Sequence, residues 1–339
     1  MSGVSIATVS RALSRPGKVN DETLTRIKVA ARRLGYIPGG TARALASGRT
    51  MLVGGVFPTI DHAIFARAIQ GLQARLTAAG YQLLVAAHDY SPAAEAAAVR
   101  AMLAQGVDAL TIVGADHLDA TWDLLTAASI PVLMTWSFDP RLPSIGFDNE
   151  RAGRLAAQHL VALGHSRIGV ISGAVHSNDR ARLRLAGIRR VLGEAGCALS
   201  ETRVVEQPFT LSGGRAGLAH LLSAAARPTA VICGNDLLAA GAVFEAQSRG
   251  IAIPSDLSVM GIDNLEIASQ INPPLTTVHL PTAELGQRAA DLLLGAAAAG
   301  ERLPRSIELP IELVVRASTA RPHGIGAVRS RRKALSSGV

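Results

Sequence analysis

The stretch GVSIATVSRAL, at residues 3–13, is the most informative segment of this 339-residue chain. Ser5 is a good N-cap for a helix that begins at the next residue, because its hydroxyl can accept a hydrogen bond from the backbone N–H of Ala7 or Thr8. A turn followed by a short capped helix is typical of the second helix of a helix-turn-helix, the element that enters the major groove of DNA.

The two faces of this predicted helix differ in chemistry. Val9 and Leu13 are four residues apart and can face a small core, whereas Ala7 and Arg11 fall on the opposite side. Ile6 lies at the N-terminal edge, the end that meets base edges in this motif. Apolar side chains there can contact a thymine methyl group, and Arg11 can bind guanine or a phosphate.

The charge of the chain is unevenly distributed. Residues 1–50 carry nine lysines and arginines against two acids, and residues 321–339 carry five with no acid. Because the whole chain has a net charge of +8, the remaining middle is acidic, at −4. A basic N-terminal head on a mildly acidic body indicates a nucleic-acid-binding segment joined to a domain with another ligand. For the tail we expect disorder.

Composition excludes several classes of protein. Hydrophobic residues make up 48% of the chain, yet no uninterrupted run is long enough to span a membrane, and no apolar signal-peptide region is present. Cys197 and Cys233 are the only cysteines and lack the CxxC spacing of a zinc site. We therefore expect a cytoplasmic protein with no disulfide, no metal and no cofactor.

A second helix is predicted after Asn20, which can cap it. Asp21 and Glu22 fall in its first turn, where negative charges interact favourably with the helix dipole. Apolar residues at positions 24, 27, 31 and 34 repeat at helical spacing, and Gly35 marks the stop. The segment 41–48 is a further helical candidate, but about eight residues are too few for a stable isolated helix.

From residue 51 onward, apolar runs alternate with amphipathic segments. The runs at 52–57, 81–87, 107–113, 132–135, 168–172, 230–233 and 257–262 predict buried strands, and segments such as 65–79 and 95–105 predict helices. This alternation predicts an α/β body with parallel sheets flanked by helices on both faces. The length suits two such lobes, and ligands bind such sheets beyond the carboxyl ends of their strands.

On these residues the chain resembles the lactose-repressor/galactose-repressor (LacI/GalR) family of bacterial transcriptional regulators. The segment at 3–13 is the most specific match. The other matching motifs are LGYIP at 34–38, ARAL at 42–45, GRT at 48–50, HLVALGH at 159–165, RLRLAG at 182–187, ND at 235–236, GIDN at 261–264 and PPLTTV at 273–278. The resemblance extends from residue 3 to about residue 318.

The resemblance implies an operator-reading head, a hinge helix, and a two-lobed body like a periplasmic binding protein that binds a small effector and dimerises. The expected domains are a head at 1–38, a hinge at 39–50, a first lobe at 51–163 plus 279–307, a second lobe at 164–278 plus 308–320, and a basic tail at 321–339. The tail lacks the leucine heptads of the family's tetramers, so a homodimer is expected.

The resemblance also implies which residues bind operator DNA. Ile6, Ala7 and Arg11 occupy the base-reading positions. Leu45 matches the hinge leucine that wedges into the minor groove, at a cost of roughly a few kcal/mol for unstacking a base step. The remaining expected DNA-binding residues, near phosphates or in the hinge, are Ser5, Thr8, Ser10, Asn20 and Arg43.

Two departures from the family pattern stand out. Only two residues precede the turn at residue 3, so the first helix of the head is missing from this sequence, and we interpret it as truncated, most simply by a start assigned too far downstream. Gly39 and Gly40 replace the usual polar cap before the hinge. Since glycine costs about 1 kcal/mol relative to alanine in a helix, the hinge should be poorly ordered without DNA.

The predicted effector site lies after the strands of both lobes. Arg184 matches the family arginine that holds a hydroxyl or carboxylate in its rigid fork of donors. Asp263 and Asn235 follow strands and can hydrogen-bond hydroxyls. Four aromatic side chains are also expected to bind the effector. They are His62, Phe65, Trp136 and Phe209. Such a pocket suits a sugar, a sugar acid or a nucleobase-like ligand.

Two other classes of function remain open at this point. The body alone could be a sugar-binding receptor of the periplasmic type, although the basic head opposes this. An enzyme built on the α/β body is opposed by the absence of a nucleophile elbow or paired carboxylates. The sequence favours an effector-controlled regulator, most simply a repressor, that binds a near-palindromic operator as a dimer.

Overall fold

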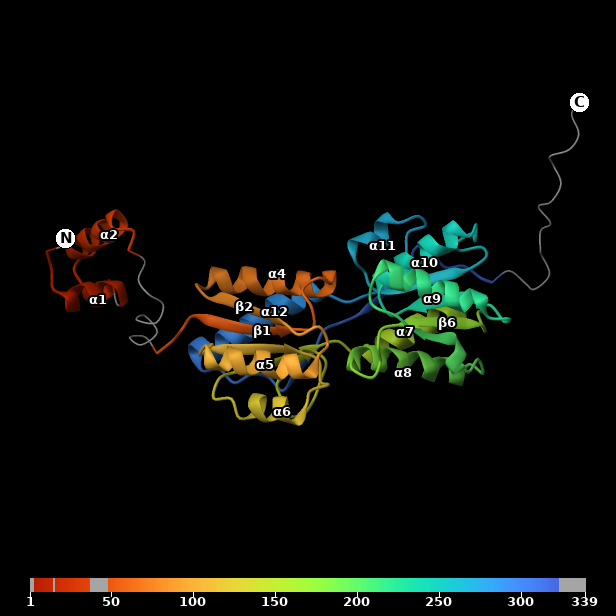
Figure 1. Cartoon of the computed structure of the whole chain (residues 1–339), viewed down its shortest axis with the longest axis horizontal. Helices are drawn as coiled ribbons and strands as arrows, with labels where there is room; N and C mark the ends of the chain where they lie inside the picture. Colours follow the sequence, from red (N-terminus) through yellow and green to blue (C-terminus); the bar gives the residue numbers. More distant parts are fainter. Residues whose placement is uncertain (1–2, 15, 37–47, 323–339) are drawn as a thin grey trace, which may run out of the picture.

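The computed structural model describes residues 3–14, 16–36 and 48–322 of the chain. Arg43, Leu45 and the expected hinge helix therefore lie outside the described residues, as does nearly all of the basic tail. The described part consists of a small helical head and a body with two lobes (Figure 1).

The head contains helix α1 (Ile6–Ser14) and helix α2 (Asp21–Arg33), joined through a short 3₁₀ turn. Both predicted caps are confirmed. The Ser5 hydroxyl accepts from the Thr8 backbone N–H at 3.2 Å, and the Asn20 side chain accepts from the Thr23 N–H at 2.8 Å. Local polar side chains therefore satisfy N–H groups that a helix leaves free at its start.

The first lobe is a six-stranded sheet in the order β11-β5-β4-β3-β1-β2, in which all neighbours are parallel. Helices α4 (Ala63–Ala78) and α12 (Thr282–Leu294) pack together on one face of the sheet, and α5 (Pro92–Ala104) and α6 (Asp119–Thr126) cover the other (Figure 1). The strands are β1 (Leu52–Phe57), β2 (Gln82–Ala87), β3 (Ala109–Val113), β4 (Val132–Trp136), β5 (Ser144–Gly146) and β11 (Ser306–Glu308).

The second lobe is also six-stranded, in the order β12-β10-β9-β8-β6-β7, and only its edge strand β12 is antiparallel. Its strands are β6 (Ile168–Ser172), β7 (Val204–Glu206), β8 (Ala230–Cys233), β9 (Ser258–Asp263), β10 (Thr276–His279) and β12 (Glu312–Val314). Its helices are α7 (Asn149–Ala162), α8 (Asp179–Glu194), α9 (Leu211–Ser223), α10 (Asp236–Ser248) and α11 (Glu266–Gln270). In the described part of the chain, no helix is long and apolar enough to cross a membrane.

The position of α7 corrects the expected boundary of the first lobe at residue 163. This helix packs on α8 and on strands of the second sheet. A Cβ on Gly153 would lie 2.0 Å from the carbonyl oxygen of Arg184, and one on Gly187 would lie 2.0 Å from that of Glu150. The two glycines let the helix backbones approach more closely than side chains permit. The helical pattern at 149–162 is visible in the sequence. Which of the two sheets this helix covers depends on its close contact with α8.

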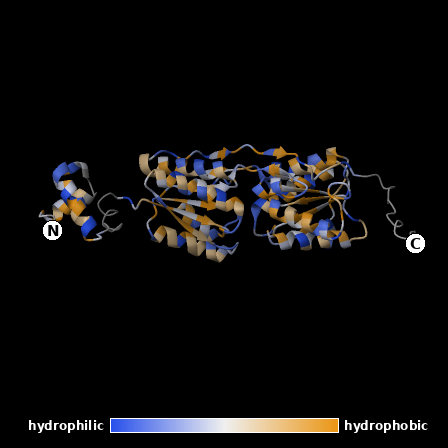
Figure 2. Cartoon of the chain, turned by 90° about the horizontal axis from the view of Figure 1, so that it is seen from above, coloured by the Kyte–Doolittle hydropathy of each residue, from blue (hydrophilic) through white to orange (hydrophobic). Residues whose placement is uncertain are grey.

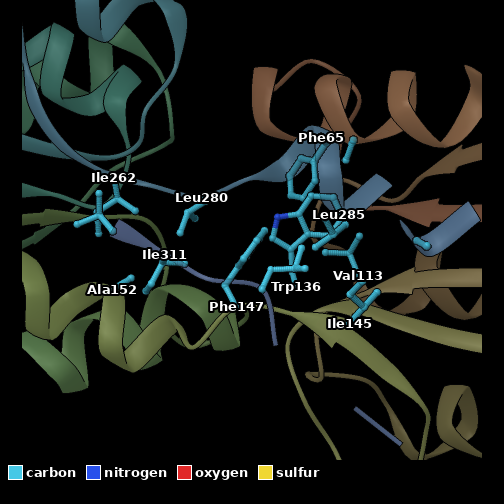
Figure 3. Close-up of a cluster of buried hydrophobic side chains, with 14 of the residues drawn as sticks. Phe65, Val113, Trp136, Ile145, Phe147, Ala152, Ile262, Leu280, Leu285 and Ile311 are labelled. Carbon is cyan, nitrogen blue, oxygen red and sulfur yellow. The ribbon is translucent and has the colours of Figure 1, made fainter. Parts of the chain in front are cut away.

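The two lobes share one hydrophobic core through the segments that cross between them. Phe147, Leu280 and Ile311 lie on three such crossings, and all are buried in a cluster that also contains Phe65 and Trp136 (Figure 3). Figure 2 shows hydrophobic residues gathered on the strands and hydrophilic residues on the outer helix faces. The three segments that cross between the lobes are thus packed into the core and are not loose linkers.

Candidate functional site

The carboxyl ends of the strands in both lobes border a cavity of about 460 Å³. In parallel sheets this edge is where ligands bind, because the chain turns there into loops and helix N-termini. The lining comes from both lobes, and the residues that matter below are His62, Asp89, Tyr90, Asn178, Glu206 and Phe209.

A smaller compartment of about 20 Å³ lies deeper in the cleft, where it shares His62, Tyr90, Asn178 and Phe209 with the outer cavity. This volume is close to the least that one water molecule needs, so the inner compartment holds a single small polar group at most. The predicted residues that line it are Phe65, Trp136, Arg184 and Asn235.

Phe65 and Trp136 form the apolar wall of the inner compartment. Each side chain is only 1% exposed, and their ring centroids lie 5.1 Å apart. Figure 3 shows both rings in the shared core, beside Phe147. These two residues therefore have a structural role in addition to the predicted contact with ligand. The indole N–H of Trp136 is buried without a hydrogen-bond partner among the described residues.

His62 and Phe209 line both the outer cavity and the inner compartment. The His62 ring stacks on Phe65 at 6.3 Å, and the Phe209 ring meets it edge-on at 5.9 Å. Since His62 lies in the first lobe and Phe209 in the second, this ring contact spans the cleft. Burial lowers the pKa of His62, so the imidazole is neutral at pH 7.

Arg184 is held in a defined orientation at the N-terminal part of α8. Its Nε donates to the Asn149 side chain at 3.1 Å and its Nη1 to the Gly234 carbonyl at 2.7 Å. Its Nη2 lies 3.9 Å from the Asp263 carboxylate. This is ion-pair distance, but it is too long for a hydrogen bond.

Asp263 is fully buried, and neither of its carboxylate oxygens has a hydrogen-bond partner within the described residues. Burial raises the pKa of this carboxyl well above its ordinary value. A buried polar group without a partner is costly, and such groups usually have a missing ligand or water. Asp263 is not among the residues that line either compartment, but Arg184, which does line the inner one, lies 3.9 Å from its carboxylate.

Asn235 has a structural task as well as a place in the site. Its side-chain oxygen accepts from the Leu238 N–H at 2.9 Å and caps α10. No hydrogen bond of its amide nitrogen is recorded among the described residues, and this nitrogen is the group that can donate to a ligand.

Backbone strain gathers around the cleft. Among the described residues other than glycine, φ is positive at Asp89, Tyr90, Trp136, Asp263 and Asn264, and elsewhere only at Met51. All five follow or end a strand beside the cleft. Such conformations are sparsely populated and tend to occur at binding sites.

Contacts outside the aromatic pair also join the two lobes. Arg182 of α8 makes a bidentate pair with Asp116, which follows β3, at 2.6 and 2.9 Å. The Ala115 N–H donates to the Asp179 carboxylate at 3.1 Å. The structure is therefore a closed arrangement of the lobes.

The head places the predicted DNA-contacting side chains of α1 on one exposed surface. Ile6 is 89% exposed, and Ser5, Ala7, Ser10 and Arg11 are exposed as well. Thr8 is half-buried and shares a hydrogen bond with the Ser5 hydroxyl, while Asn20 is exposed at the start of α2. The face opposite Ile6 packs inward, with Ala12 of α1 and Ile27 of α2 buried.

The sequence analysis did not predict every lining residue of the cleft, and five of those it missed carry polar groups that bear on ligand binding. Asp89 and Tyr90 lie two and three residues after the predicted strand at 81–87, so their position was a usable signal. The others are Asn178, Arg180 and Glu206. Glu206 ends the three-residue strand β7, which is too short to be recognised from a pattern.

Comparisons with known proteins agree with this architecture. Residues 1–39 match the family described as "Bacterial regulatory proteins, lacI family", and residues 157–319 match the "Periplasmic binding protein-like domain". The HTH-type transcriptional regulator DegA of Bacillus subtilis (strain 168) is 34% identical over 324 residues, 94% of this chain and 95% of DegA.

Two solved structures are similar over most of the chain. A LacI-family transcriptional regulator from Silicibacter pomeroyi superposes with a TM-score of 0.87 at 30% identity, covering 94% of this chain and 97% of that protein. The lac repressor dimer bound to operator and the anti-inducer ONPF gives a TM-score of 0.82 at 30% identity, covering 94% and 96%.

Proposed function

Because the chain belongs to the lacI family of bacterial regulatory proteins, we propose that it represses transcription from a near-palindromic operator as an effector-controlled homodimer. Its relatives over nearly the whole length are transcriptional regulators, so the chain is a DNA-binding regulator and neither an enzyme nor a free-standing sugar receptor. Such a protein works in the cytoplasm, where the chromosome is.

The observation that carries this proposal is that one chain has both an exposed DNA-contacting surface on α1 and a closed cleft between two lobes. Ile6, Ala7 and Arg11 are exposed together on α1, as base readout requires. Two buried polar groups without partners among the described residues lie at this cleft: the Trp136 indole lines its inner compartment, and the Asp263 carboxylate lies 3.9 Å from Arg184, which also lines it. We assign Arg184, Asn235, His62 and Phe209 to effector binding around them.

The coupling between cleft and DNA follows from lobe closure. An effector that binds the closed form better than the open form shifts the population toward closure by its differential affinity. In a dimer this changes the spacing of the two hinges and heads, with a coupling of typically about 1–3 kcal/mol. The domains that we propose for this coupling are the head at 1–38, the hinge at 39–50 with Arg43 and Leu45, and the two lobes. Helix α7 belongs to the second lobe.

The test is fluorescence anisotropy with a library of near-palindromic duplexes at two salt concentrations. The chain is assayed as it stands and with one helix added upstream of Gly3, because a helix-turn-helix needs a preceding helix. In the form that binds, R11A should reduce the preference for operator over other duplexes. Loss of a bidentate contact with a base lowers the binding free energy by about 1–3 kcal/mol.

The matched control is R302A, which removes one exposed arginine from the first lobe and should leave operator selectivity unchanged. If neither form prefers any duplex over random DNA, the proposed function is wrong.

A further inference from the structure

The outer cavity of the cleft has an acidic lining that the sequence analysis did not anticipate. Asp89 follows β2 in the first lobe, and Glu206 ends β7 in the second, and both side chains line the cavity of about 460 Å³. Among the described residues that line this cavity, none is lysine or arginine. His62 adds no positive charge at pH 7, because burial lowers its pKa.

Closure brings these two carboxylates to one chamber from opposite lobes. Both residues are exposed to solvent, so water and salt weaken the repulsion between the two carboxylates, and it is strongest at low salt. Their repulsion opposes closure in the empty protein. A positive charge between them turns this repulsion into two attractions that exist only in the closed form. Binding of a cation in this chamber is therefore linked to closure.

The opposite end of the cleft has a different chemistry. The inner compartment, of about 20 Å³, holds the unpartnered indole N–H of Trp136, which is 1% exposed. Arg184 and the amide nitrogen of Asn235 supply further donors beside it. One hydroxyl group fits this volume and can accept from these donors.

Arg184 does not make the inner end a good carboxylate site. Its Nε and Nη1 are engaged by Asn149 and Gly234, and its Nη2 faces the buried Asp263. The compartment is also too small for a carboxylate, and a ligand with an acid group in the outer chamber would meet two carboxylates instead of a cation.

We propose that the effector is a small polyhydroxylated amine, with an amino sugar as the simplest example, whose ammonium group lies between Asp89 and Glu206 and whose hydroxyl enters the compartment at Trp136. This inference rests on the proposed function, because it takes the cleft as the effector site. It narrows the expected ligand from a sugar or sugar acid to a cationic sugar derivative.

The experiment uses matched ligands that differ mainly in charge. Glucose, glucosamine and glucuronate form one set, and the corresponding galactose and mannose compounds form two more. Calorimetry and thermal shift measure binding to the full chain. In at least one set we expect the amine to bind about tenfold more tightly than the neutral sugar, as charge-assisted hydrogen bonds add to affinity, and the acid to bind most weakly.

The double variant D89N/E206Q should lose this preference for the amine while it binds the neutral sugar as before. Asparagine suits position 89, where φ is 48°, because it tolerates the left-handed region. The control D119N/E201Q also removes one exposed carboxylate from each lobe, but away from the cavity, and should keep the preference.

The inference is overturned if the neutral or acidic member binds as tightly as the amine in every set, or if no amine binds at all. Operator release separates the two proposals. An acidic sugar that binds and releases operator would leave the proposed function standing and overturn the inference. An amine that binds with the expected preference but leaves operator affinity unchanged would support the inference and contradict effector control.

Discussion

Arg182 of α8 and Asp116, which follows β3, form a two-pronged ion pair that joins the second lobe to the first. The pair lies beside the Ala115–Asp179 hydrogen bond, so the loop after β3 contacts the start of α8 at several points. Because these contacts join residues of the two lobes, opening of the cleft would break them. Their strength therefore contributes to the balance between open and closed forms.

We expect D116N to shift the protein toward the open form. Both side chains are partly exposed, at 48% and 31%, and such pairs contribute about 0.2–1 kcal/mol. Effector affinity should fall roughly two- to fivefold at low salt, with a larger radius of gyration by small-angle X-ray scattering, and both effects should shrink in high salt.

The matched control for this pair is E201Q. Glu201 pairs with Arg189 of the same helix α8, but this pair lies within the second lobe. If E201Q changes effector affinity and the radius of gyration as much as D116N, the Arg182–Asp116 pair has no special effect on closure.

The contact between α7 and α8 predicts a large effect of adding a single methyl group. In G187A the new Cβ would lie 2.0 Å from the Glu150 carbonyl oxygen, so the two helices must separate. Overpacking of this kind costs about 1–3 kcal/mol of unfolding free energy. It should also weaken effector binding, since Arg184 is on α8. Urea denaturation measures the first effect and calorimetry the second.

G193A provides the comparison on the same helix. A Cβ at Gly193 meets nothing within 4 Å, so this variant should be neutral or up to about 1 kcal/mol more stable. Equal midpoints for the two variants would refute the proposed close approach of α7 and α8.

A pH dependence follows from Asp236 at the start of α10. Burial raises the pKa of its carboxyl to about 7, although Thr277 and the Leu265 N–H both donate to it. The folded protein therefore holds the proton more strongly than the unfolded chain, whose carboxyl titrates near about 4. The resulting stability is complete below pH 4 and is lost as the pH rises through 7.

D236N removes this titration. Relative to the parent, the variant should gain unfolding free energy between pH 4 and 7, by up to about 1.4 kcal/mol per pH unit, on top of a constant offset from the altered hydrogen bonds. Urea denaturation at pH 5, 6 and 7 measures the difference, and D61N, at an exposed carboxylate, is the control. Parallel stability curves for D236N and the parent would contradict the assignment.

The two cysteines should differ sharply in reactivity. Cys233 is completely buried in β8, and burial raises the pKa of its thiol, so the reactive thiolate is scarce. Cys197 is half-buried in the turn after α8. A chromogenic disulfide reagent should modify one thiol in the native protein and two in denaturant. Loss of the native reaction in C197S confirms the assignment, and its persistence contradicts it.

The sequence predicted the elements whose signals are local. The strands at 52–57 and 230–233 begin and end as predicted, because each is an uninterrupted run of residues without a polar side chain. The caps Ser5 and Asn20 are also correct, because capping involves residues only three positions apart. The three-residue strands β5, β7, β11 and β12 were not predicted, since three residues carry no recognisable period, and the four-residue strand β10 was not predicted either.

By itself the sequence determined the family, the alternation of the longer strands with helices in the body, and the DNA-reading helix α1 with its cap, because periodicity, capping and motif spacing act over a few neighbouring residues. Only the tertiary structure decided that α7 covers the second sheet, that Phe65 and Trp136 belong to the shared core, and that Asp89 and Glu206 border one cavity. These relationships depend on how surfaces far apart in the chain fit together, and close backbone approach at Gly153 and Gly187 has no signature along the sequence.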